Sequence, residues 1–300
     1  MNRLFLAIIW RLFPFLERMG LHLLPVHYYS PIPDARELRK KRHSFNVEHP
    51  MYGVDVPPGE EQLQFLKKIV APFEEEYVRS GYGRFGLEVD QMTSFAPLNA
   101  LTLYAIIRHF KPKRMIEVGS GKSTEVSAAA FIENEHEGGA GEFVAIEPYP
   151  SAQLERGYEG LANLIKKKVE EVRVELFLEL GENDILFIDS SHAVKIFGDV
   201  NFLYLTVLPQ LKPGVIVHIH DIFFPHDYLP QHFFGKHKNI WQEQYLLHAF
   251  LVFNREYRIL LSCSYVHYKY LDELSSLFPW YHAERCPSSF WMRRGAGAIL

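Results

Sequence analysis

The sequence predicts a doubly wound α/β domain preceded by an N-terminal helical and extended arm. After about residue 93, short apolar runs of strand length recur along the chain, and segments able to form helices separate them. This alternation is typical of βαβ units around a mostly parallel sheet. The 300 residues, of which 48% are hydrophobic and 23% charged, are enough for one large domain with an extension.

The expected boundary divides the chain into an arm, residues 1–92, and the α/β domain, residues 93–300. Within the arm, prolines and a basic run at 36–42 indicate extended chain between residues 27 and 58. The glycine and acids that follow predict a helix over residues 59–79.

Residues 1–24 are largely apolar, but Arg11, Glu17 and Arg18 interrupt them, so no run is long enough for a spanning helix. No small-residue cleavage site of a signal peptide follows. We expect an amphipathic helix that Pro14 breaks midway. Such a helix either packs on its own domain or on a partner, or makes peripheral membrane contact.

Composition restricts the partners and the compartment. The net charge is −4, with acids and bases mixed along the chain, which argues against binding to nucleic acid. The two cysteines, Cys263 and Cys286, are too few for a disulfide framework or a zinc finger. We therefore expect a cytoplasmic protein, with membrane association through the arm left open. Whether it forms a homo-oligomer also stays open.

The elements of the α/β domain follow one another in order. The expected strands are 114–118, 142–147, 184–189 and 215–220, with a closing pair at 257–262 and 289–294. The expected helices are 97–110, 122–134, 151–160, 174–180, 193–208 and 240–254. Between the fourth of these strands and the last of these helices, an aromatic and histidine-rich loop with two prolines is expected to fold over the site as a lid.

The stretch MIEVGSGKST, residues 115–124, looks like the tail of an ATP-binding phosphate loop, but two departures weaken the nucleotide interpretations. A phosphate loop needs glycine where Ile116 stands. A dinucleotide fingerprint fits Gly119 and Gly121 but has Thr124 at its third glycine position. The turn is therefore expected to serve a different ligand.

Two acids accompany the turn. Glu117 lies near the end of the first strand, and Gly119-Ser120-Gly121 leads directly into a helix, which lets a ligand approach the backbone. Glu147 ends the second strand, where acids of nucleotide-binding folds accept hydrogen bonds from ribose hydroxyls. Together they suggest S-adenosylmethionine as the cofactor.

Four segments carry a resemblance to a known family: IEVGSGKST, AIEPYP, NDILFIDSSH and LKPGVIVHIHDIFFPHDY. In order and spacing, over roughly residues 90–295, the chain resembles the class I S-adenosylmethionine-dependent methyltransferases, and within them a bacterial methyltransferase-domain group. The resemblance implies a seven-stranded Rossmann-like sheet whose last strand is antiparallel. The residues expected around the cofactor are Glu117, Gly119, Ser120, Gly121, Glu147 and Asp189.

A second group of polar residues follows the fourth and fifth expected strands. Asp189 and His192 come after one strand, and His220 and Asp221 close the next. His192 and His220 are candidate bases for deprotonating an acceptor hydroxyl, with Asp221 beside them. All four side chains also form a mixed set suited to a divalent metal ion, and catechol-type methyltransferases, which the chain resembles here, place magnesium at corresponding strand ends. A hydrogen-bonded network without metal is the alternative, and His218 is expected to be a core residue.

The function expected from these features is S-adenosylmethionine-dependent methylation of a hydroxyl on a small metabolite or glycan precursor. Two alternatives remain at this point. One is a metal-dependent oxygenase or hydrolase on the same fold, and the other is a non-catalytic binding or scaffold protein that uses the arm for interaction.

Overall fold

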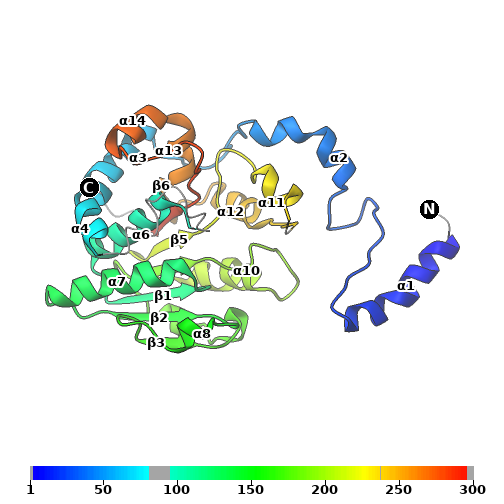
Figure 1. Cartoon of the computed structure of the whole chain (residues 1–300), viewed down its shortest axis with the longest axis horizontal. Helices are drawn as coiled ribbons and strands as arrows, with labels where there is room; N and C mark the ends of the chain where they lie inside the picture. The colour runs from blue at the N-terminus through cyan, green and yellow to red at the C-terminus, as the bar shows by residue number, and fades with distance from the viewer. Residues whose placement is uncertain (1–2, 81–94, 237, 296–300) are drawn as a thin grey trace. The chain divides into compact units, whose positions relative to one another are not determined.

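The computed structural model describes residues 3–80, 95–236 and 238–295 (Figure 1). By packing, the chain divides into a smaller unit, residues 1–47 and 229–240, and a larger unit, residues 48–228 and 241–300. Residues 59–79 pack on the helices and strands of the larger unit. The expected boundary near residue 92 lies outside the described residues.

The larger unit is built on a seven-stranded sheet with the order β3-β2-β1-β4-β5-β7-β6, in which β7 alone is antiparallel to its neighbours (Figure 1). The strands are β1 (Arg114–Val118), β2 (Glu142–Ile146), β3 (Asn163–Ile165), β4 (Ile185–Ile188), β5 (Ile216–Ile219), β6 (Tyr257–Ser262) and β7 (Phe290–Arg294). The expected fold class is therefore confirmed, and each expected strand occurs within one residue of its expected ends. The unexpected strand is β3, which has three residues and lies at the edge of the sheet.

Helices cover both faces of this sheet. They are α3 (Gly59–Phe65), η2 (Leu66–Val70), η3 (Ala71–Phe73), α4 (Glu74–Arg79), α6 (Pro97–Phe110), α7 (Lys122–His136), α8 (Ala152–Glu155), η4 (Val169–Glu171), α9 (Glu175–Leu178), α10 (Asp199–Phe202), η5 (Leu203–Val207), η6 (Leu208–Gln210), α12 (Glu243–Leu251), α13 (Cys263–Lys269) and α14 (Leu271–Leu277). One core cluster joins α3, η2, α6, α7, α13 and α14 to the sheet, and the other joins α9, η5 and α12 to the opposite face.

Alternation along the strands decides which side chains meet each face. In β4, Phe187 belongs to the first core cluster and Leu186 to the second. By the same alternation, Glu117 of β1 and His218 of β5 point to the face that α6 and α7 cover. His218 stacks on Phe187 with ring centroids 4.0 Å apart, which confirms it as a core residue.

Four expected helices are shorter than predicted: those over 174–180 and 240–254 are observed as α9 and α12, and the other two, over 193–208 and 151–160, have identifiable causes. The helix expected over 193–208 begins only at Asp199, because the Asp199 carboxylate accepts hydrogen bonds from the backbone N–H and the hydroxyl of Ser191 and holds the preceding loop. Phe197 in that loop has φ of 55°, which a helix does not allow. The helix expected over 151–160 is reduced to α8, which is followed by two glycines with positive φ, Gly157 and Gly160.

The smaller unit contains α1 (Arg3–Arg18), α2 (Ala35–Lys40), η1 (Arg42–Asn46) and α11 (Pro230–Phe234). The expectation that Pro14 breaks the first helix is wrong, because α1 continues through it. A proline removes one backbone donor, and the rest of the helix can retain its hydrogen bonds. Among the described residues, no helix is long and apolar enough to cross a membrane.

The turn after β1 depends on one glycine more than on the other. Gly119 has φ of 82°, and a Cβ there would lie 1.9 Å from the carbonyl oxygen of Asp189. Gly121 has an extended φ of −167°, and a Cβ there would meet nothing within 4 Å. The first glycine is therefore required by the fold, whereas the second is not.

Replacing Gly119 by alanine should lower the melting temperature by at least about 5 °C, since left-handed backbone costs an alanine about 1–2 kcal/mol before any clash with Asp189. Gly121→Ala is the matched control and should melt within about 2 °C of the wild type. Thermal unfolding followed by circular dichroism distinguishes the two. Equal melting temperatures for the two variants would contradict the close approach of Gly119 to Asp189.

Candidate functional site

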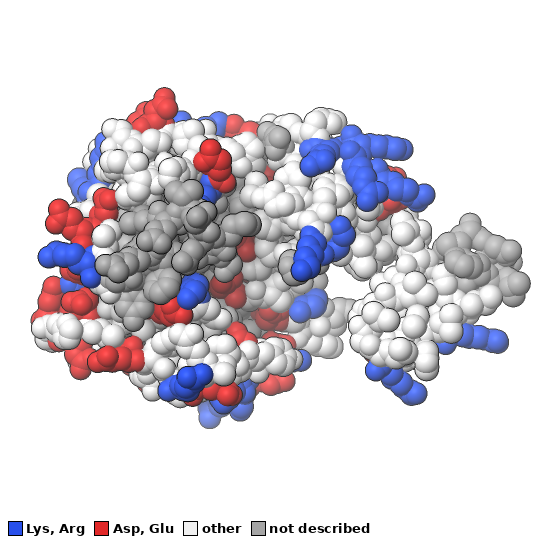
Figure 2. All heavy atoms as spheres, viewed as in Figure 1, with Lys and Arg blue, Asp and Glu red and all other residues white. Residues whose placement is uncertain are grey.

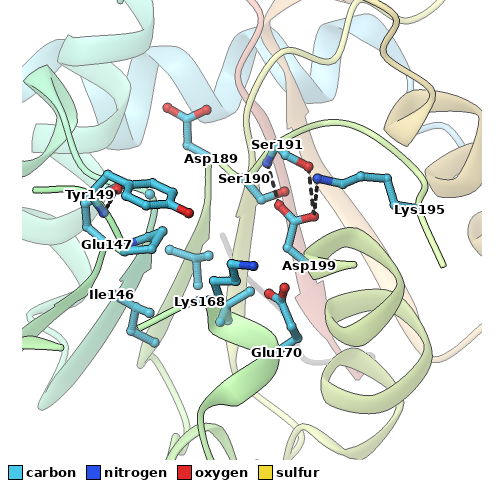
Figure 3. A pocket seen from close by; sticks show the side chains of 14 residues that line it. Ile146, Glu147, Tyr149, Lys168, Glu170, Asp189, Ser190, Ser191, Lys195 and Asp199 are labelled. Atoms are coloured by element: carbon cyan, nitrogen blue, oxygen red, sulfur yellow. Dashed lines mark hydrogen bonds and ion pairs between the residues drawn. The ribbon is translucent and has the colours of Figure 1, made fainter. Parts of the chain in front are cut away.

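A cavity of about 430 Å³ opens at the carboxyl ends of β1, β2 and β4 (Figure 3). Its lining includes three of the residues expected around a cofactor, Gly119, Glu147 and Asp189. The crevice at the carboxyl ends of parallel strands is where doubly wound sheets bind ligands. The location of the cavity therefore agrees with a ligand site at the glycine turn.

Backbone hydrogen bonds hold the three strand ends together. The N–H of Gly119 donates to the carbonyl of Ile146 at 2.9 Å, and the N–H of Asp189 donates to the carbonyl of Val118 at 2.8 Å. The Glu147 carboxylate accepts from the N–H of Ser120 at 3.2 Å. As a result, the turn after β1 is attached to the tips of both neighbouring strands.

Glu147 is oriented before any ligand arrives. One of its carboxylate oxygens accepts from Ser120, and the other accepts from the N–H of Tyr149 at 2.8 Å. Figure 3 shows Glu147 and Tyr149 on one side of the cavity, with Ser191 and Asp199 across from them. At the helix start, the N–H of Gly121 donates to the Thr124 hydroxyl at 3.1 Å.

Glu117 is a buried acid without a hydrogen-bond partner. Its side chain is fully buried, and neither carboxylate oxygen has a hydrogen-bond partner in the part of the chain that the structure describes. Burial raises the pKa of Glu117 to about 8. An acid of this kind is stabilised in its charged form by any cationic group brought beside it.

Several further residues of the lining were not indicated by the sequence. Lys168, Val169 and Glu170 follow the short strand β3, and Lys195 lies 3.8 Å from the carboxylate of Asp199. Because β3 was not recognised, nothing in the sequence indicated that the segment after it would reach the site. The cavity thus has an apolar part at Val169 and a charged part around it.

Beside the cavity, His192 is surrounded by three carboxylates. Its Nε2 lies 3.2 Å from Oδ1 of Asp189 and 3.6 Å from Oδ2 of Asp221, and its Nδ1 lies 2.8 Å from Oε2 of Glu243. Burial acts to lower the pKa of His192, but the hydrogen bonds with Asp189 and Glu243 and the nearby negative charges outweigh it and raise that pKa well above its usual range. His192 is therefore an imidazolium at neutral pH.

Glu243 is the main residue of this cluster that sequence reasoning missed. It is completely buried in α12, 51 residues after His192. Burial raises the pKa of Glu243, and the contact with His192 opposes that shift. No short motif links the two residues, so only the packing of α12 on the second face of the sheet brings them together.

The backbone of the cluster is unusual at two points. His192 and Asp221 have φ of 56° and 54°, which places their backbone in the left-handed region that residues other than glycine rarely adopt. The His192 carbonyl accepts from the N–H groups of Gln242 and Glu243 at 2.9 and 3.2 Å, which stabilises this conformation. Non-glycine residues in this region concentrate at functional sites.

His220 joins the cluster through Asp221. Its Nε2 lies 3.7 Å from Oδ1 of Asp221, and the other side of that carboxylate faces His192. The Ser288 hydroxyl donates to Oδ1 of Asp221 at 3.0 Å. Among the described residues, Nδ1 of the buried His220 has no hydrogen-bond partner. The four residues expected after β4 and β5 are thus brought together in space.

The expected divalent ion finds no support in this arrangement. Within residues 3–80, 95–236 and 238–295, no three His, Cys, Asp or Glu side chains are arranged to hold a metal. The imidazole of His192 lies between the carboxylates of Asp189 and Asp221 and pairs with both. These contacts match the alternative expectation of a hydrogen-bonded and ion-paired network.

Residues 116–222 match the model of a family described as a methyltransferase domain. This segment holds the glycine turn, the four acids that line the cavity and the polar cluster apart from Glu243. The chain belongs to the class I S-adenosylmethionine-dependent methyltransferases. An uncharacterized protein of Archaeoglobus fulgidus is 31% identical over 169 residues, which are 54% of this methyltransferase and 75% of the relative.

Solved methyltransferase structures show weaker similarity. The mycinamycin-pathway methyltransferase MycE, in complex with Mg, S-adenosylhomocysteine and mycinamycin VI, is 14% identical with a TM-score of 0.41, covering 82% of this chain and 66% of that one. The plantazolicin methyltransferase BamL, in complex with S-adenosylhomocysteine and a substrate analogue, is 12% identical with a TM-score of 0.38, covering 79% and 97%.

The raised pKa of Glu117 has a consequence for the stability of the ligand-free methyltransferase. Between its unfolded pKa of about 4.5 and its folded pKa of about 8, the folded state keeps a proton that the unfolded state loses. The contribution of Glu117 to the free energy of unfolding therefore falls as pH rises through this range, by up to about 1.4 kcal/mol per pH unit.

Glu117→Gln should remove that contribution. Denaturant unfolding at pH 5 and pH 8, without ligand, should show the variant gaining stability relative to the wild type as pH rises, since glutamine does not titrate. Comparing the variant with the wild type cancels the other titrating groups. A stability difference that does not change with pH would contradict the raised pKa.

Proposed function

We propose that this methyltransferase transfers a methyl group from S-adenosylmethionine to a hydroxyl of a small metabolite or glycan precursor. The observation that carries this proposal is the position of Asp189, which lines the cavity and also pairs with His192 at 3.2 Å. One residue therefore links the cofactor cavity to a cluster of groups able to handle a proton. Such a cluster is of use when the acceptor is a hydroxyl, which must lose its proton during transfer.

On the cofactor side, four features of the chain support a fit to S-adenosylmethionine. The Glu147 carboxylate, already oriented by two backbone donors, accepts hydrogen bonds from the ribose hydroxyls. The buried Glu117, which directly precedes the cavity-lining Val118, would hold the methionine ammonium group, whose positive charge would stabilise its carboxylate form. Val169 provides apolar contact for the adenine, and Gly119 lets the ligand approach the turn.

On the acceptor side, the chain holds and deprotonates the hydroxyl. Methyl transfer would join the acceptor oxygen to the methyl carbon as the carbon–sulfur bond breaks and leaves its electron pair on sulfur, and the hydroxyl proton would pass to a base of the chain. His220 accepts that proton, because His192 already carries one at neutral pH. Asp221 orients His220, and the His192 imidazolium holds the carboxylates of Asp189 and Asp221 in place.

The alternatives have less support. No step is assigned to a metal ion, because the described side chains lack a suitable ligand arrangement. The oxygenase or hydrolase alternative depended on that ion. The scaffold alternative conflicts with the family to which the chain belongs.

His220→Ala tests the proposed base. Turnover should fall by about 10²-fold or more while the affinity for S-adenosylhomocysteine stays within about twofold, the usual pattern for a positioned base that does not bind cofactor. The assay measures S-adenosylhomocysteine release with an acceptor found by screening hydroxylated metabolites and activated sugars. His136→Ala, whose side chain is 67% exposed on α7, is the matched control and should keep full turnover.

Chelation in the same assay distinguishes deprotonation by His220 alone from deprotonation assisted by a metal ion. Treatment with a chelator should leave wild-type turnover unchanged. Loss of turnover that added Mg²⁺ restores, or full turnover by His220→Ala, would contradict the assignment of the base.

A further inference from the structure

Helix α1 exposes a stripe of large apolar side chains. Ile8, Leu12 and Phe15 are spaced i, i+4 and i+7 and so share one face of the helix, and they are 48%, 43% and 60% exposed. Aligned apolar side chains of this size are rarely left in water without a binding purpose. This apolar stripe therefore indicates a docking surface.

Arginines border the apolar stripe. Arg11 is three residues after Ile8 and four before Phe15, and Arg18 is three residues after Phe15, so both lie next to the stripe on the helix surface. Both arginines are exposed. An apolar face flanked by basic side chains is typical of helices that lie in the interface of a bilayer.

The segment after α1 keeps the same character. Met19, Leu21 and Val26 are 61%, 56% and 60% exposed, and Tyr28 and Tyr29 are 94% and 86% exposed. Tyrosine, with an apolar ring and a polar hydroxyl, is enriched at the boundary between lipid and water. The exposed apolar surface thus extends beyond the helix.

The charge of the chain is distributed unevenly, and this selects the partner. Residues 1–47 contain eight Lys or Arg residues and three Asp or Glu residues, which gives a net charge of +5. The remaining residues contain 24 Lys or Arg residues and 33 Asp or Glu residues, which gives a net charge of −9. The basic run 36–42 is exposed and forms a blue cluster over α2 in Figure 2. A second copy of such a basic segment would be repelled, whereas an anionic surface would be attracted.

We propose that the smaller unit docks this methyltransferase on an anionic bilayer surface. The apolar stripe of α1 enters the boundary between headgroups and acyl chains, and Arg11, Arg18 and the basic run 36–42 pair with lipid phosphates. The helix lies along the surface, since no described helix can cross a membrane. This proposal is independent of the assigned catalytic base.

Vesicle co-sedimentation of the full chain tests the proposal. The wild type should sediment with phosphatidylglycerol-containing vesicles and remain in solution with pure phosphatidylcholine vesicles. Ile8→Ser/Leu12→Ser/Phe15→Ser should reduce the bound fraction by about tenfold or more. The matched control is Leu205→Ser/Phe253→Ser, which removes side chains 67% and 85% exposed in the larger unit and should bind like the wild type.

A second pair of variants tests whether the arginines of α1 contribute to binding of anionic lipid. Arg11→Glu/Arg18→Glu should lose binding, whereas Lys67→Glu/Lys68→Glu makes the same charge change on an exposed part of the larger unit and should retain it. Wild-type binding should weaken as salt is added. Binding of S-adenosylhomocysteine, measured on every variant, shows whether the larger unit remains folded.

Three results would overturn the proposal: no binding to anionic vesicles, equal loss in control and test variants, or an apolar-stripe variant that changes only the oligomeric state. The last result would assign the stripe to a second copy of the chain.

Discussion

The close approach of Gly119 to the carbonyl of Asp189 is the constraint on which the rest of the site depends. A Cβ at Gly119 would lie 1.9 Å from that oxygen, so the turn after β1 and the tip of β4 can meet only through a glycine with positive φ. This contact places the glycine turn against the residue that begins the polar cluster. The cavity and the polar cluster around His192 therefore share Asp189, and a small change in the turn should reach both.

Two buried titratable residues near this contact, Glu117 and His192, differ in their surroundings. Glu117 has no hydrogen-bond partner among the described residues and keeps its proton until a cation arrives, whereas His192 is already balanced by surrounding carboxylates. Three carboxyl groups surround the His192 imidazole, and burial raises the pKa of one of them, Glu243.

Much of the larger unit was predictable because its signals are local. The apolar runs predicted β1 and β6 at their full length, and the glycines and acids near Gly119 and Glu147 predicted a ligand site where the structure has a cavity. Other features depend on distant contacts and could not be predicted from the sequence. Glu243 reaches His192 only through the packing of α12, and the start of α10 is set by Asp199 binding back to Ser191. The three-residue strand β3 is too short to show a pattern, so the residues after it were missed as well.

The claim at the centre of this interpretation is that the glycine turn and Glu147 form a site for S-adenosylmethionine and not for a nucleoside triphosphate. Isothermal titration calorimetry tests it directly on wild type, on Glu147→Ala, and on Glu155→Ala as a control at an exposed acid paired with Lys166. S-adenosylhomocysteine should bind the wild type and the control equally, and Glu147→Ala should bind it more weakly by about 1.5–3 kcal/mol, the loss expected for a charged hydrogen-bond acceptor. ATP should give no binding heat. Tight binding of ATP without binding of S-adenosylhomocysteine, or an unchanged affinity in Glu147→Ala, would contradict the claim.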